Sequence, residues 1–72
     1  MYAHRIWKRR VRSKGIFAGD KIELFDLVGN FILTETARSS SHSMDISSLA
    51  PGIYIIKVDN KKPEKIIKTN EN

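Results

Sequence analysis

Hydrophobic and polar residues alternate along several short stretches of this chain, most clearly after Pro51 and Gly52. The six residues that follow are β-branched or aromatic except for one lysine. This composition is typical of a strand with at least one covered face. Proline fixes its own φ and glycine readily adopts a positive φ, so the pair favours a tight turn before the strand. The pattern predicts a strand over residues 53–59, with alternate residues buried: Tyr54, Ile56 and Val58.

A second region reads as a β-hairpin. Residues 22–26 and 30–37 are strand-like. The four residues from Asp26 to Gly29 make the turn that connects them. Asp at the first position and Gly at the fourth are typical of a type I turn, closed by a glycine in the left-handed conformation. Strict alternation then predicts one shared buried face for the two strands. That face would carry Ile22, Leu24, Phe31 and Leu33.

The rest of the chain supplies shorter elements. The pattern predicts a strand over residues 5–11, turns around residues 15–20, an exposed loop over residues 38–43 and a last strand over residues 64–69, after Pro63. Ile46 and Leu49 are expected to close one end of the core. Short strands with turns between them, and no convincing helix, predict an all-β fold: an antiparallel sandwich or a small barrel.

Length and charge divide the chain in two. Its 72 residues allow one domain, and without cysteine no disulfide can support a small core. Residues 1–21 hold seven Lys or Arg against one Asp, a net charge of +6, whereas the remainder carries −1. We therefore expect a basic N-terminal segment over residues 1–21, as an edge strand or arm, and a β domain over residues 22–72. Residues 1–21 lack the apolar core of a secretory signal, and no apolar run is long enough to span a bilayer.

Seven residues within 22–69 form a recognisable signature. They lie in an Asp-x-x-Gly hairpin, in an Asp-hydrophobic-Ser-x-Leu-x-x-Gly-hydrophobic-Tyr run and at the start of the last strand. The residues are Asp26, Gly29, Asp45, Leu49, Gly52, Tyr54 and Lys65. This region resembles the C-terminal sorting domain of the type IX secretion system of Bacteroidota. The Pro-Asn-Pro segment that usually opens that domain is missing here.

The resemblance implies a small immunoglobulin-like β-sandwich that serves as a non-catalytic recognition module. Its partner would be the outer-membrane translocon, and the attached protein would be secreted or placed on the cell surface. An exposed last strand, residues 65–69, would pair with that partner by β-augmentation. Because the missing segment leaves the sandwich incomplete, we also expect a homodimer.

The basic segment supports an alternative function, binding of nucleic acid or another polyanion. Cations interleaved with an aromatic ring neutralise phosphates and stack bases. The residues concerned are Arg5, Trp7, Lys8, Arg9, Arg10, Arg12 and Lys14. The simpler interpretation is a solvated edge whose charge prevents sheets from pairing. A stand-alone structural or oligomerisation module is a further alternative.

Catalysis is not expected. Ser41 and His42 are adjacent, but a nucleophile and its base must meet in space with an orienting group. No spacing of histidines and carboxylates predicts a metal site, and no glycine-rich pattern predicts a cofactor. Asp26 and Asp45 are better explained as turn and cap residues than as an acid and base pair.

Overall fold

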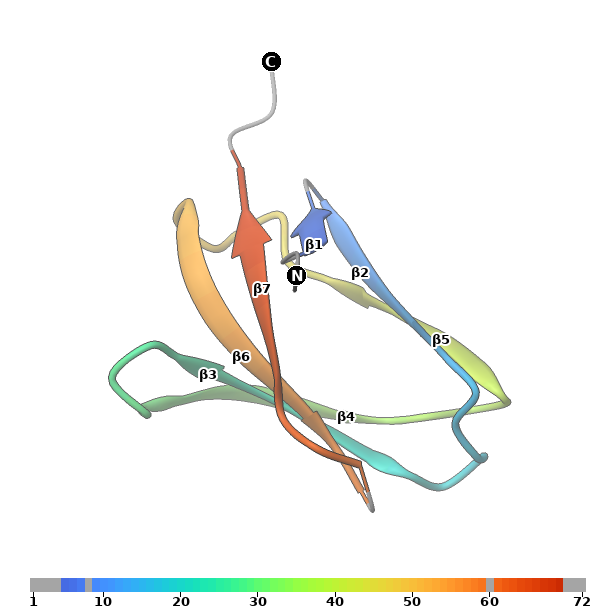
Figure 1. The fold of residues 1–72 in the computed structure, drawn as a ribbon. Helices are drawn as coiled ribbons and strands as arrows, with labels where there is room; N and C mark the ends of the chain where they lie inside the picture. The colour runs from blue at the N-terminus through green and yellow to red at the C-terminus, as the bar shows by residue number, and fades with distance from the viewer. Residues whose placement is uncertain (1–4, 8, 60, 70–72) are drawn as a thin grey trace.

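The computed structural model describes residues 5–7, 9–59 and 61–69, which form seven strands and no helix (Figure 1). The strands are β1 (Arg5–Trp7), β2 (Arg10–Lys14), β3 (Lys21–Asp26), β4 (Phe31–Thr36), β5 (Ser41–Asp45), β6 (Gly52–Val58) and β7 (Glu64–Lys68). The predicted all-β fold is confirmed. No helix in these ranges is therefore able to cross a membrane.

Two sheets of unequal size make up the fold. The larger has the order β1-β7-β6-β3-β4, and the smaller contains only β2 and β5. All neighbouring strands are antiparallel except β1, which runs parallel to β7. In Figure 1, β2 and β5 face the larger sheet across the interior. The small sheet has two strands, against five in the large sheet.

The core lies between the two sheets. Alternate residues of β3 and β6 face it, and Tyr54, Ile56 and Val58 are all buried, as the alternation predicts. Ile46 is fully buried and Leu49 packs against the core, which confirms that they close its end. Two further core residues, Val11 and Ile16, come from the basic segment. Residues 10–16 are therefore part of the packed domain.

The hairpin prediction was right for the turn and wrong for one side chain. Leu24 pairs with Leu33, but Phe25 pairs with Phe31, so Ile32 is an extra residue in β4. Such a β-bulge moves the residues beyond it to the other face. Phe31 is consequently 56% exposed, and its ring meets that of Phe25 edge to face at 5.9 Å.

Three other expectations were also wrong. The single strand predicted over residues 5–11 is instead two strands, β1 and β2, which belong to different sheets. The predicted loop at residues 38–43 ends early, since β5 begins at Ser41 and pairs with β2. The last strand does not lie at the edge of the sheet, because β1 pairs with β7 along residues 66–68. The edge position that was expected for β7 is occupied by β1.

Candidate functional site

Asp26 and Gly29 hold the β3–β4 turn. The Gly29 N–H donates to the Asp26 carbonyl at 3.0 Å, and Gly29 has a φ of 102°, as the turn prediction requires. The Asp26 carboxylate accepts hydrogen bonds from the backbone N–H groups of Val28 and Asn30 and from the Asn30 side-chain amide. The bonds from Asn30, with smaller ones from Gly29 and Val28, lower the pKa of Asp26 below its ordinary value.

Asp45 has the same role at the end of β5. Its Oδ1 accepts the Ser47 N–H at 2.9 Å, and the next turn is closed by the Leu49 N–H donating to the Ile46 carbonyl. The hydrogen bonds from Ser47 are the main cause that lowers the pKa of Asp45, and the nearby charges of Arg10 and Arg9 lower it further. Both aspartates thus shape turns, as expected.

The corner before β6 is closed by Tyr54. Its hydroxyl donates to the carbonyl of Ala50, four residues upstream, while its ring lies in the core. Gly52 has a φ of 157°, a value that L-residues rarely adopt, and no atom beyond its two chain neighbours lies within 4 Å of the position a Cβ would occupy there. A tyrosine hydroxyl bonded to an upstream carbonyl is a recurrent corner device in β-sandwiches.

The signature residues do not converge on one site. Asp26, Gly29, Asp45 and Gly52 lie at turns, and Leu49 and Tyr54 lie against the core. Lys65 is exposed on the outer face of the large sheet, opposite Ile55. The signature therefore specifies the fold more than a binding surface.

That outer face carries an apolar stripe that crosses four strands, in which Phe31 and Ile53 are exposed and the other residues are partly covered. The register places Phe25 beside Phe31 and Ile55, and Ile53 beside Ile67. Leu27 and Val28 extend it at the hairpin, where Val28 is 86% exposed. Exposed apolar patches on protein surfaces are frequent sites of protein contact.

The basic residues gather on β2. Arg10, Arg12 and Lys14 alternate along the strand on its solvent face, about 6.8 Å apart at the usual rise of a strand. With Trp7 and Ser43 they line a shallow depression of about 330 Å³. Arg9 is exposed, and its carbonyl accepts the Ile46 N–H. The side chains of Arg5 and Lys8 lie outside the described residues.

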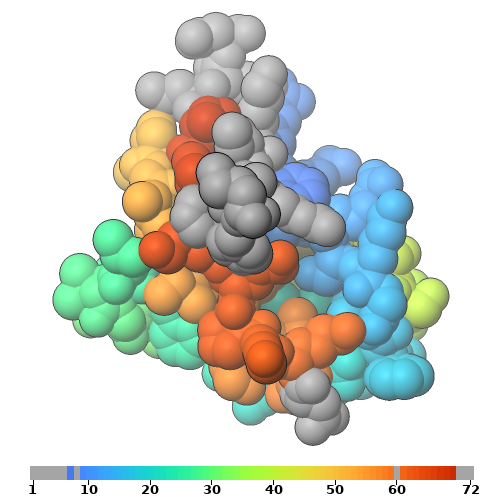
Figure 2. All heavy atoms as spheres, in the orientation of Figure 1, coloured from blue at the N-terminus to red at the C-terminus, as the bar shows by residue number. Residues whose placement is uncertain are grey.

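A cleft opens between β2 and the turn that joins β6 to β7. It measures about 220 Å³; we call it the basic cleft. Its floor consists of the apolar residues Val11, Ile16, Ile56, Val58 and Ile66, and its polar rim of Arg12, Ser13, Lys14, Lys61, Lys62 and Glu64. Trp7 also lines it. Figure 2 shows the orange atoms of the β6–β7 turn on one side and the blue atoms of β2 on the other.

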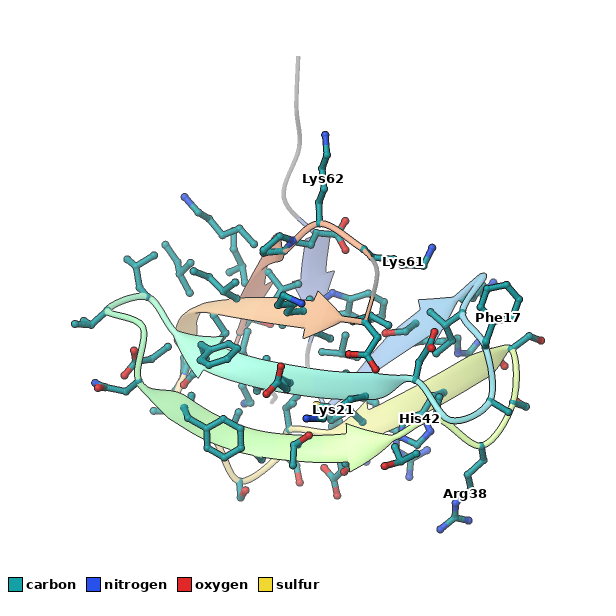
Figure 3. The ribbon with its side chains drawn as sticks, turned by 90° about the horizontal axis from the view of Figure 1, so that it is seen from below. Phe17, Lys21, Arg38, His42, Lys61 and Lys62 are labelled. Atoms are coloured by element: carbon teal, nitrogen blue, oxygen red, sulfur yellow. The ribbon has the colours of Figure 1, made fainter. Side chains whose placement is uncertain are left out.

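Sequence reasoning missed the second side of this cleft. Lys61 and Lys62 belong to no predicted site, yet both line this cleft, and in Figure 3 their side chains project outward from the turn that carries them. Four cations from segments about fifty residues apart thus surround one apolar floor. Only the packing of the two sheets brings these cations together, and no local sequence motif indicates that they are close.

The described residues show no catalytic arrangement. Ser41 and His42 are consecutive on β5, so their side chains point to opposite faces of the sheet. His42 instead contacts Glu35 of β4, with 2.7 Å between Nε2 and Oε1. Within residues 5–7, 9–59 and 61–69, no group of three His, Asp or Glu residues is placed to hold a metal.

Comparison with protein families links these features to secretion. The model of the secretion system C-terminal sorting domain matches residues 10–69, so the match begins at β2 and includes every strand after it. Comparison with curated proteins and with solved structures found no match. A match over most of the chain shows the family. The chain belongs to the C-terminal sorting domains of the type IX secretion system.

Proposed function

We propose that this domain is a folded address label, recognised by the outer-membrane translocon of the type IX system. The family match over residues 10–69 carries the proposal. Membership implies a C-terminal sorting signal on a secreted or cell-surface protein, recognised by proteins of the secretion machinery. The domain would bind the translocon without performing chemistry, and its cargo would then be anchored or released after cleavage from it.

The placement of the signature residues supports the proposal that a partner recognises the surface of the folded domain. Asp26, Asp45 and Tyr54 make hydrogen bonds within the domain that shape its turns. The apolar stripe from Phe31 to Ile67 offers a protein partner what those residues do not, a partly exposed apolar surface on the large sheet.

A reporter fusion tests the proposal. Residues 1–72 are placed at the C-terminus of a reporter with its own export signal, and surface delivery is measured in type IX-competent bacteria. We expect delivery that disappears in a strain lacking the translocon. Equal delivery in both strains, or none from a folded fusion present in the periplasm, would contradict the proposal.

A shorter fusion separates the sorting domain from the basic segment. Residues 22–72 lack Val11 and Ile16, which are 3% and 2% exposed in the core. We expect this fusion to fail because it cannot complete its core, whereas residues 10–72 should be delivered. Delivery by residues 22–72 would show that β2 is dispensable.

A further inference from the structure

We propose that the basic cleft binds an extended segment of a partner protein in which acidic and apolar residues alternate. The segment would pair with the open edge of β2 and become the third strand of the small sheet. This inference rests on the cleft and on the open edge of β2, and it holds whether or not the domain sorts cargo.

The first observation is the open edge. In the described part of the chain, β2 pairs with β5 alone. The Arg9 carbonyl accepts the Ile46 N–H, so odd-numbered residues of β2 direct their backbone groups toward β5. Arg10, Arg12 and Lys14 therefore direct theirs to the other edge. A row of such N–H and C=O groups is the template that β-augmentation uses.

The second observation is the floor beside that edge. Residues of β2 line the basic cleft together with residues of β6 and β7, and no residue of β5 does, so the cleft lies on the open side of β2. Val11 contributes to its apolar floor from β2, Ile16 from the segment that follows β2, and Ile66 from the larger sheet. An added strand would place every second side chain over this floor. The volume is small for an enclosed drug-sized ligand, but it suits a few side chains of a segment.

The third observation is charge. The rim carries Arg12, Lys14, Lys61 and Lys62 against the single carboxylate of Glu64. The outward side chains of an added strand would lie directly opposite Arg10, Arg12 and Lys14, where acidic residues form favourable cross-strand pairs. A second copy of β2 would bring like charges together, so the cations disfavour self-pairing and select an acidic partner.

Nucleic acid fits these observations less well. Phosphates would use the cations of the β2 stripe, but they would leave the apolar floor and the free backbone groups of β2 unused. The two ligands therefore differ in one measurable property, the hydrogen bonding of the Arg12 and Lys14 amides.

A peptide titration followed by NMR tests the proposal on the full chain. The probe is the capped peptide Glu-Val-Glu-Val-Glu-Val-Glu, compared with its isomer Glu-Glu-Val-Val-Val-Glu-Glu, its lysine counterpart and an oligothymidine strand. We expect the alternating acidic peptide to bind at least about ten-fold more tightly than the others. It should also slow the hydrogen exchange of the Arg12 and Lys14 amides.

Charge reversal provides the matched variants. Arg12→Glu with Lys62→Glu should weaken binding of the acidic peptide at least about ten-fold. Lys21→Glu with Arg38→Glu changes the net charge equally at positions that do not line the cleft, and it should leave binding within about two-fold. Dispersed amide spectra of both variants confirm that they fold.

Several results would overturn the proposal. No binding of the alternating peptide at about 1 mM would do so, because a specific site of this kind should exceed that affinity. Equal binding of the isomer would show that the alternation of acidic and apolar residues is not recognised. Tighter binding of oligothymidine, with both amides unprotected, would instead make the basic stripe a phosphate site.

Discussion

Replacement of Leu24 by alanine should remove a large share of the stability of this domain. Leu24 is 0% exposed, at the middle of β3, where Ile56 and Leu33 are its cross-strand neighbours. Leu→Ala at fully buried sites costs about 2.7–5.0 kcal/mol, because transfer energy is lost and a cavity remains. A 72-residue domain is stable by only about 4–11 kcal/mol. The variant should therefore lose close to half of its free energy of unfolding.

Leu27→Ala is the matched control. Leu27 is 53% exposed in the hairpin turn, so the same chemical change should cost no more than about 0.5 kcal/mol there. Urea unfolding followed by Trp7 fluorescence and by circular dichroism gives both free energies. The Leu24 variant should also melt at least about 11 °C lower, since each kcal/mol shifts the midpoint by about 4–8 °C. Equal losses in the two variants would refute the inward placement of Leu24.

The other predictions concern turns, acid and assembly. Tyr54→Phe should cost about 1 kcal/mol by calorimetry, because the Ala50 carbonyl loses its donor; an unchanged melting temperature would remove that hydrogen bond from the account. Gly29→Ala should cost about 1–3 kcal/mol because of its φ of 102°, and Gly52→Val should destabilise strongly; wild-type melting of either variant would argue against these turn conformations. The pKa values of Asp26 and Asp45 are lowered by folding, so their contribution is present above the unfolded pKa of about 3.9 and is lost as pH falls through the folded values. Asp→Asn at both positions should flatten the loss of stability below about pH 4, and an unchanged acid profile would contradict this. A homodimer stays a prediction, which light scattering over a wide dilution series tests; a monomer throughout would exclude it.

Local patterns predicted the parts of the fold that local physics controls. The turn between Asp26 and Gly29 and the buried face of β6 follow from residue types and period-two alternation. The placement of Phe31 does not, because the bulge at Ile32 depends on how β4 pairs with β3. The partner of β7 was missed for a similar reason. Its parallel pairing with β1 joins segments at opposite ends of the chain.

The basic segment shows the same limit for the candidate site. The charge distribution predicted a basic segment over residues 1–21 outside the domain. Val11 of β2 lies within that segment, but it is buried in the core. Two apolar residues among many cations give a weak local signal. The basic cleft needs Lys61 and Lys62 as well, which only tertiary packing brings near Arg12.

The central claim is that the translocon recognises a folded domain. It is tested most directly by measuring the surface delivery of a domain that keeps every signature residue but cannot fold. A reporter with its own export signal carries residues 1–72 as wild type, as Leu24→Asp or as Phe17→Asp. Leu24→Asp leaves every signature residue in place but puts a carboxylate at a fully buried position, whereas Phe17 is 75% exposed. We expect surface delivery of the wild type and of Phe17→Asp, with intact Leu24→Asp fusion retained in the periplasm. Delivery of Leu24→Asp at the wild-type level would show that the linear signature is recognised, and would contradict the account.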